Sequence, residues 1–278
     1  LRKQLADMLH KVGGITCSFN ATVYPETLQF VPELLRWGQE NIDRVHVMVF
    51  INYRMAILGK DVDFYVGDTQ VHFDEMMYSK RDDHRRTDIT SPGVVELIRR
   101  GEPGFAPCAY LNGTERPDTF KWLLTGRMGN AREIFGYVGP KFMEIVQTWN
   151  HLVSGKYLAY APPAMQRRGR LYFLLAPFDA GLRGVMKRYL SALFRNPGAF
   201  FRRVHFQSVM IIQPADILET GAVNMCDGCP DITVWNDQLV WSCRMEEQMK
   251  WGQNVRMVPR RNGAEEDAQP HPVHADVE

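Results

Sequence analysis

The sequence predicts an α/β fold built on parallel strands. Ile15–Val23 and Val45–Asn52 have the patterns of strands, and a helical pattern lies between them. A strand, a helix and a strand within about forty residues form a βαβ unit, whose two strands run parallel in one sheet. His205–Gln213 is a further apolar segment with the pattern of a strand. The fold class therefore follows from three strands and one connecting helix.

The first predicted strand has one apolar and one polar face. Gly13 and Gly14 end a short helix before it. Along Ile15–Val23, apolar or small residues alternate with the polar residues Thr16, Ser18, Asn20 and Thr22. Strands of a parallel sheet are normally apolar on both faces because both are covered. The polar face indicates either an edge strand or a barrel strand whose inner face lines a ligand-filled lumen.

The connecting helix and the second strand have simpler patterns. Apolar residues recur along one helical stripe, with Pro32 near its start. The stripe consists of Leu28, Val31, Leu34, Leu35 and Ile42. One face of Val45–Asn52 is β-branched throughout, as expected for a buried strand.

The middle of the chain has weaker patterns. Tyr53–Ser91, with the charged run 80–86, is predicted as a solvated loop. A helix follows to Arg100, with Ser91 as its N-cap and Pro92 as its first residue. The remaining predictions are strands at Lys121–Thr125 and Arg170–Ala176 and helices at Lys141–Val153 and Gly181–Phe194.

Composition and charge exclude several classes of protein. The chain has 278 residues, 45% of them hydrophobic, which excludes a disordered or fibrous protein. Its 33 basic and 32 acidic residues give a net charge of +1, so no overall electrostatic attraction to nucleic acid is expected. No apolar run approaches the roughly 18–20 residues of a transmembrane segment, and Leu1–Lys11 lacks the apolar core of a signal peptide. We therefore expect a cytoplasmic protein.

The cysteines carry the strongest chemical signal. Cys226 and Cys229 are separated by two residues, and Cys243 follows a predicted hairpin formed by Ile232–Val234 and Gln238–Trp241. The hairpin would return Cys243 toward the pair, so that three thiolates converge. In a reducing compartment cysteines are free thiols or metal ligands more often than they form disulfides.

Three kinds of site fit these cysteines. A structural zinc ion would need a fourth ligand, either Cys108 or a histidine. An iron–sulfur cluster accepts three or four thiolates. A redox-active pair is the third alternative, but Cys229 is followed by Pro230 rather than by the strand-to-helix setting expected for it. Cys108 is equally well explained as a buried small residue, and Cys17 is predicted in the core.

Together these residues resemble the C-terminal part of a radical S-adenosylmethionine (SAM) enzyme. Gly14–Val23 resembles the fourth barrel strand of that superfamily, and Val45–Ile51 resembles the fifth. Cys226, Cys229 and Cys243 have the CX2CX13C spacing of the auxiliary [4Fe–4S] cluster in twitch- or SPASM-like domains, as in the molybdenum-cofactor biosynthesis cyclase. The resemblance covers residues 12–55 and 205–250.

The resemblance implies a fold and a chemistry. It implies a partial (β/α) barrel over residues 1–215 and a small cluster-binding β-hairpin extension over 216–258. The tail, 259–278, is predicted to be disordered on its own composition, because it contains several prolines and charged residues and few apolar ones. A reduced cluster would donate an electron to SAM, and the resulting 5′-deoxyadenosyl radical would abstract hydrogen from an unknown substrate. A flavodoxin or ferredoxin would supply the electron.

Site residues follow from the same resemblance. Ser18, Asn20 and Thr22 would contact SAM, although hydrogen bonding to neighbouring strands explains them equally well. Cys226, Cys229 and Cys243 would hold the auxiliary cluster. Cys108 would be its fourth ligand, or else one iron would be open to substrate.

One departure from the family is serious. The CxxxCxxC motif that binds the catalytic cluster is absent, because no two of the five cysteines are four positions apart. We expect that the chain lacks the N-terminal half of the enzyme, rather than being a degenerate paralogue or one part of a split protein. Whether this chain is itself an enzyme is therefore left open, and the second hypothesis is a non-catalytic binding module stabilised by zinc or a cluster.

A last segment combines basic and aromatic residues. It runs from Arg183 to Tyr189 and continues through Arg195 to Phe200–Arg203. This pattern suits a phosphate, an anionic lipid headgroup or a partner protein. The alternative is a solvated basic helix face whose aromatic residues lie in the core.

Overall fold

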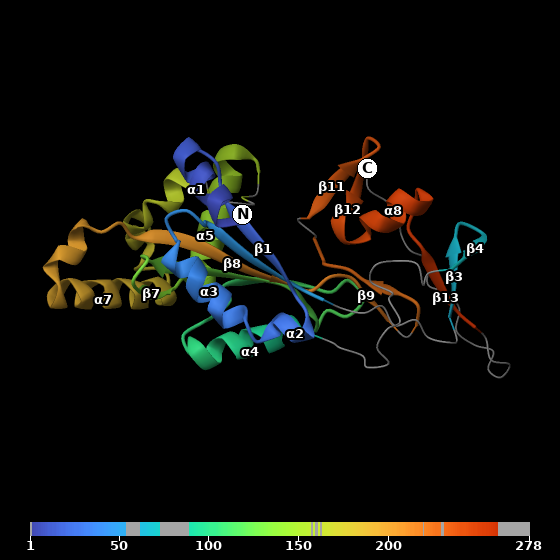
Figure 1. Ribbon diagram of the computed structural model, residues 1–278, viewed down its shortest axis with the longest axis horizontal. Coiled ribbons are helices and arrows are strands. Elements are labelled where there is room, and N and C mark those ends of the chain that lie inside the picture. Colours follow the sequence, from blue (N-terminus) through green and yellow to red (C-terminus); the bar gives the residue numbers. More distant parts are fainter. Residues whose placement is uncertain are drawn as a thin grey trace.

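Six strands form the main sheet of a mixed α/β protein, shown by a computed structural model (Figure 1). The structure describes residues 2–53, 62–72, 89–156, 158, 161, 163–218, 220–228 and 231–260. The strand order is β1-β2-β8-β6-β5, and β7 also pairs with β6. These strands are β1 (Ser18–Val23), β2 (Val47–Asn52), β5 (Ala109–Asn112), β6 (Phe120–Gly129), β7 (Ile134–Tyr137) and β8 (His205–Ile212).

The sheet is parallel on one side and antiparallel on the other. β1 pairs parallel with β2, and β2 pairs parallel with β8, so the predicted βαβ unit is confirmed. β6 runs antiparallel to β8 and carries both β5 and β7 along its length. No closed barrel is found among the described strands, because the path ends at β1 and at β5.

Helices cover one face of the sheet near its parallel strands. They are α1 (Arg2–Val12), α2 (Pro25–Leu28), α3 (Val31–Glu40) and α4 (Ser91–Gly101). Leu35 of α3 and Ile98 of α4 join the core cluster that contains Met48 and Phe50 of β2. Register pairs Met48 with Val209, so β8 contributes the same face to this core.

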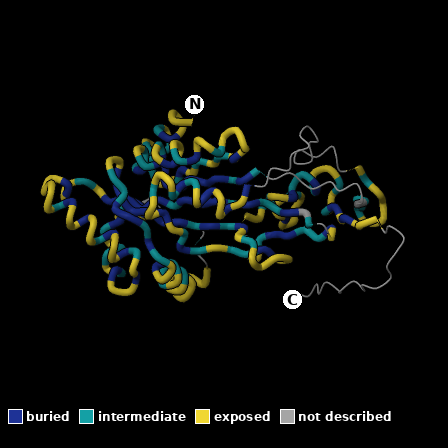
Figure 2. The backbone as a smooth tube through the Cα atoms, turned by 90° about the horizontal axis from the view of Figure 1, so that it is seen from below, coloured by how far each residue is buried: buried dark blue, intermediate teal, exposed yellow. Residues whose placement is uncertain are grey.

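A second set of helices packs against β6, β7 and β8. It comprises α5 (Pro140–Ser154), α6 (Pro163–Gln166), the 3-10 helix η2 (Gly169–Leu175), α7 (Ala180–Arg195) and the 3-10 helix η3 (Pro197–Phe201). Leu182 and Val185 of α7 share a core cluster with Met128 of β6 and Phe206 of β8. Figure 2 shows the main sheet as the most continuously buried part of the chain, with exposed residues along the outer sides of the helices.

Small strands and one helix form the C-terminal region. The elements are β9 (Asp216–Ile217), β10 (Val223–Asn224), β11 (Ile232–Trp235), β12 (Gln238–Trp241), the 3-10 helix η4 (Ser242–Arg244), α8 (Met245–Trp251) and β13 (Arg256–Pro259). β13 pairs antiparallel with β3 (Val62–Val66), which pairs in turn with β4 (Thr69–Val71). Residues 216–258 are therefore joined to a hairpin from the first quarter of the chain (Figure 1).

Most predicted elements are confirmed with shifted ends. The predicted helix between the first two strands is divided into α2 and α3, and the strand predicted from Ile15 begins at Ser18. The predicted N-cap of α4 was wrong by one residue, because Thr90 Oγ1 accepts the hydrogen bond from Gly93 N at 3.2 Å. Ser91 is instead buried, and its backbone N–H donates to Gln213 Oε1.

Two predictions of secondary structure were wrong. The strand predicted at Arg170–Ala176 is wrong, because Gly169–Leu175 form the 3-10 helix η2, whose aromatic side chains pack on α7 and β8. Phe173 stacks with Tyr189 at 5.3 Å between ring centroids. Tyr53–Ser91 is not wholly a loop, since it contains β3 and β4. The charged run 80–86 and all but the first two residues of the predicted tail 259–278 lie outside the described residues.

A buried arginine joins the sheet to the helices. Arg127 Nε donates to Gln207 Oε1 at 2.7 Å, and Arg127 Nη2 donates to the carbonyl of Leu35 at 2.8 Å. Arg127 Nη1 lies 3.7 Å from a carboxylate oxygen of Glu102, which also accepts a hydrogen bond from Tyr137. Burial lowers the pKa of Arg127, and burial with the Glu102 carboxylate raises the pKa of Tyr137.

A buried histidine, His46, lies directly before the first residue of β2. His46 Nδ1 accepts a hydrogen bond from the backbone N–H of Cys17 at 3.0 Å, which requires the ring to leave Nδ1 unprotonated. Burial lowers the pKa of His46 to about 4, and the positive charges of Arg167, His205 and His10 lower it further, against the opposite effect of Asp43. The structure therefore favours a neutral ring.

The folded protein should lose stability in mild acid because of His46. Below its ordinary pKa of 6.5 the unfolded chain binds a proton that the folded chain rejects until about pH 4. We expect this residue to lower the free energy of unfolding by at most about 2 kcal/mol across that window, allowing for solvent screening. His46→Asn keeps an acceptor for Cys17 and should flatten the loss, measured by urea unfolding at about pH 7 and about pH 5.

The exposed His151 of α5 offers a matched control. His151→Asn, measured in the same way, controls for the loss of one histidine from the chain. Equal acid dependence in the wild type and in His46→Asn would show that His46 does not titrate in this way.

Candidate functional site

The polar row of β1 is exposed to solvent. Ser18, Asn20 and Thr22 alternate with half-buried or buried residues, and Ser18 Oγ donates to Asn20 Oδ1 at 3.0 Å. Register places them beside Val47, Val49 and Ile51 of β2 on one face of the sheet. β1 is at the end of the strand path, as the edge-strand interpretation predicts. The Ser18–Asn20 bond lies within β1 and does not reach a neighbouring strand.

Two cysteines lie in the apolar core. Cys17 is buried beside the α1 and α3 cluster, as predicted. Cys108, directly before β5, is buried in the cluster around α7, and its thiol donates to the carbonyl of Leu124 at 3.4 Å. Burial raises the pKa of Cys108 from 9.0 to about 11. This environment matches the interpretation of Cys108 as a buried small residue.

Cys226 lies at the opposite end of β5. It forms an antiparallel bridge with Gly113, and the N–H of Asp227 donates to the carbonyl of Asn112 at 2.8 Å. Five strand positions between Cys108 and Gly113 correspond to roughly 15 Å. The structure therefore does not bring Cys108 to Cys226.

The predicted hairpin is confirmed. β11 and β12 pair from Ile232 with Trp241 to Trp235 with Gln238. Asn236 and Asp237 form its turn with φ values of 47° and 62°, which suit the left-handed turns that match strand twist. Asn and Asp tolerate this conformation better than most residues, which is why the turn forms here.

The hairpin returns Cys243 toward its starting point. The N–H of Ser242 donates to the carbonyl of Asp231, and Ser242 Oγ donates to Asp231 Oδ1, both at 3.2 Å. Cys243 follows in η4 and is exposed. Cys229 lies outside the described residues, and within the described ranges no three His, Cys, Asp or Glu side chains are grouped to hold a metal ion.

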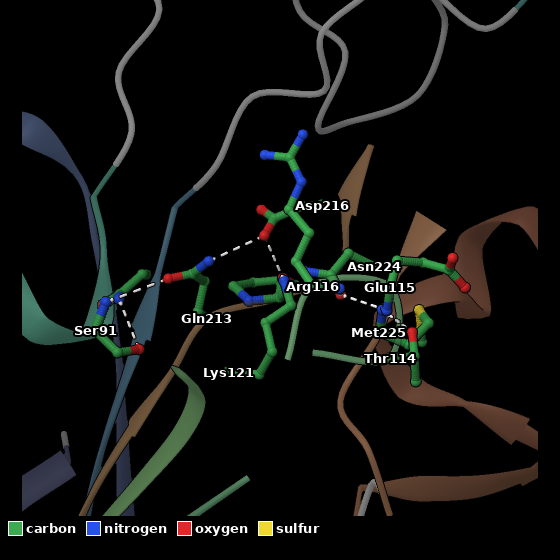
Figure 3. Close-up of polar contacts among 11 residues, drawn as sticks. Ser91, Thr114, Glu115, Arg116, Lys121, Gln213, Asp216, Asn224 and Met225 are labelled. Carbon is green, nitrogen blue, oxygen red and sulfur yellow. Dashed lines mark hydrogen bonds and ion pairs between the residues drawn. The ribbon is translucent and has the colours of Figure 1, made fainter. Parts of the chain in front are cut away.

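A buried polar network lies where β2 and β8 end (Figure 3). Lys121 Nζ, fully buried, lies 2.6 Å from both the carbonyl of Pro214 and Asp216 Oδ2. Gln213 links this ion pair to the start of α4, because its Nε2 donates to Asp216 Oδ2 and its Oε1 accepts from Ser91. Removing one partner of a buried ion pair is costly, so this network fixes β9 to the main sheet.

A second set of contacts holds the strand that carries Cys226 (Figure 3). Asn224 is buried, and its Oδ1 accepts from the N–H groups of Glu115 and Arg116 at 3.0 and 3.1 Å. Thr114 N donates to the carbonyl of Met225, and Met225 N donates to Thr114 Oγ1. Cys226 is thus positioned by backbone contacts to the loop after β5.

These two networks could not be predicted from the sequence. Their residues come from separate elements and have no characteristic spacing. The one available signal was position, since Gln213 and Asp216 follow the carboxyl end of β8, where α/β sheets commonly place functional polar residues.

Comparison with known proteins gave no match to a family model, to a curated protein or to a solved structure.

Gly113 should tolerate no side chain. A Cβ atom there would lie 2.2 Å from Asn224 Oδ1 and 2.7 Å from the carbonyl of Arg116. Gly113→Ala should therefore lower the free energy of unfolding by about 2 kcal/mol, measured by urea denaturation. Gly184→Ala is the matched control, because nothing lies within 4 Å of its Cβ position inside α7 and alanine favours helix. Equal stability of the two variants would contradict the packing described here.

Alkylation should separate the exposed cysteine from the buried ones. Because the pKa of Cys108 is raised from 9.0 to about 11, its thiolate fraction at neutral pH is roughly a hundredfold lower than that of an ordinary cysteine. Burial also keeps the reagent away from the sulfur. In the folded protein prepared without iron or zinc, iodoacetamide should therefore modify Cys243 and leave Cys108 unmodified, as measured by peptide mass spectrometry. Denatured protein, in which all cysteines react, is the control. Similar rates for Cys108 and Cys243 in the folded protein would contradict their assigned environments.

Proposed function

We propose that this chain is part of a radical SAM iron–sulfur enzyme and that residues 216–258 bind an auxiliary [4Fe–4S] cluster. The observation that carries the proposal is the hairpin β11–β12, which returns Cys243 to Asp231 shortly after the Cys226–Cys229 pair in sequence. Three cysteines with CX2CX13C spacing can bind one cluster only if the chain turns back between the second and the third, as it does in this hairpin.

The environments of the described cysteines fit a cluster. Cys226 is half-buried and Cys243 is exposed, whereas Cys17 and Cys108 are buried among apolar side chains. A thiol must deprotonate to bind iron or zinc, and burial in the core opposes this. The ligand set proposed is therefore Cys226, Cys229 and Cys243, without Cys108.

The polar row of β1 supports the SAM-binding part of the proposal. Ser18, Asn20 and Thr22 are open to solvent on one face of a parallel strand, so their side chains are available to a polar ligand. In a partial barrel continued beyond β1, this face would point into the lumen and contact the ribose and methionine groups of SAM. A reduced [4Fe–4S] cluster together with SAM supplies hydrogen abstraction, and the motif for that catalytic cluster is not in this sequence.

Anaerobic reconstitution with iron and sulfide tests the proposal. We expect about four iron atoms per chain, with the absorbance and paramagnetic resonance of a [4Fe–4S] cluster. The double substitution Cys226→Ser and Cys229→Ser should abolish iron uptake, because it removes two of three ligands.

Cys108→Ala provides the matched control, since it removes a thiol that the proposal excludes from the site. This variant should retain iron. Stoichiometric zinc without iron uptake would contradict the proposal and favour the non-catalytic, zinc-stabilised module. Loss of iron in Cys108→Ala as well as in the double variant would contradict the ligand set.

A further inference from the structure

One segment of the chain is strongly basic although the whole chain is nearly neutral. Residues 180–204 contain six basic residues and no acidic residue. The basic residues are Arg183, Lys187, Arg188, Arg195, Arg202 and Arg203. The neighbouring Asp179 is buried, where its carboxylate caps α7 by accepting from the N–H of Leu182 at 2.7 Å. The segment therefore presents uncompensated positive charge of its own.

The same segment exposes large apolar side chains. Phe194 and Phe201 are 89% and 87% exposed, and Leu190 and Phe200 are also exposed. The core-facing side of α7 is occupied separately by Leu182, Val185, Tyr189 and Ala192, so the exposed residues are not the core stripe of the helix. The interpretation in which the aromatic residues lie in the core therefore fails for these phenylalanines.

Basic and apolar residues share one face of the helix. Lys187, Leu190 and Phe194 are spaced by three and four positions, which places them in one row along α7. η3 begins after a single intervening residue, Asn196, so Phe200 and Phe201 lie shortly after the end of α7 in the chain. We call Lys187, Leu190, Phe194, Arg195, Phe200 and Phe201 the α7–η3 surface.

The aromatic end of this surface is held in place from within the protein. Arg170 of η2 donates to the carbonyls of Phe200 and Arg202, the latter at 2.5 Å. Its guanidinium also stacks over the rings of Phe200 and Tyr189, at 4.9 and 5.6 Å from their centroids. A fixed backbone lets the exposed rings bind a partner without a large loss of conformational entropy.

The surface lies at one end of the molecule. Figure 1 shows α7 at the far left, with the chain passing through η3 at the same end, away from β3, β4 and β13. Nearly full exposure of two phenylalanines means that they protrude and do not line a recess. A protein partner would need a recess that matches these rings, whereas the fluid boundary between lipid headgroups and acyl chains needs no preformed recess.

We propose that the α7–η3 surface docks this protein on anionic phospholipid membranes. Lys187 and Arg195 would contact lipid phosphates, while Phe194 and Phe201 would enter the boundary between headgroups and acyl chains. Basic residues around protruding apolar ones are the pattern that interfacial binding requires. Among the described helices, none has the length and apolar character to cross a bilayer.

Vesicle cosedimentation of the full chain tests this proposal. We expect binding to vesicles of phosphatidylcholine with phosphatidylglycerol, little binding to phosphatidylcholine alone, and weakening by added salt. Phe194→Ser with Phe201→Ser should reduce the partition coefficient at least roughly tenfold, because two apolar groups no longer insert. Lys187→Glu with Arg195→Glu should abolish the preference for anionic lipid.

A matched control is available on the hairpin β11–β12. Val234 and Leu239 are exposed, apolar and paired across the strands, and Val234→Ser with Leu239→Ser should leave vesicle binding unchanged. Circular dichroism checks that each variant is folded. Absence of binding by the wild type, equal binding to neutral vesicles, or loss in the hairpin variant would overturn the proposal. Tighter binding of a single-stranded RNA oligonucleotide by the same surface, lost in both surface variants, would also overturn it.

Discussion

The buried guanidinium of Arg127 is the interaction on which the arrangement of sheet and helices depends. Its Nε and Nη2 donate to acceptors on β8 and α3, and its Nη1 lies 3.7 Å from the Glu102 carboxylate at the end of α4, so two hydrogen bonds and an ion pair offset the cost of burying the charge. Gln207 extends the network, because its Nε2 donates to the carbonyls of Gly38 and Val45. Displacement of any one of these elements would leave a buried polar group unpaired, so their positions are coupled.

The C-terminal region depends on the sheet in a similar way. An ion pair joins Lys121, near the start of β6, to Asp216 of β9, and the side chain of Asn224 accepts a hydrogen bond from the loop after β5. Arg244 and Glu247 then fix η4 to α8 by a buried ion pair at 2.6 Å, with the backbone of Val255 bonded to both side chains. Buried polar contacts therefore fix the strand that carries Cys226 to the main sheet, and a separate set fixes the segment after Cys243 to α8 and Val255.

Local patterns were enough to predict the parts of the fold whose partners are close in sequence. The βαβ unit and the Asn236–Asp237 hairpin follow from periodicity and turn residues, and both are confirmed. Short apolar runs such as Arg170–Ala176 fit either a strand or a packed helix, and only tertiary contacts decide between them. The hairpin that returns Cys243 was predicted, whereas the Lys121–Asp216 network was not, because no spacing marks residues from distant elements.

The pairing of β13 with β3 sets an order on folding during synthesis. Arg256 and Gly67, which are in hydrogen-bond contact, are 189 positions apart. The hairpin β3–β4 therefore leaves the ribosome long before the strand that completes its sheet. A two-stranded hairpin is marginal in water, so it stays incomplete while the main sheet assembles. This small sheet can consequently be completed only after β13 has been synthesised, and a chain truncated before residue 256 would have this edge unpaired.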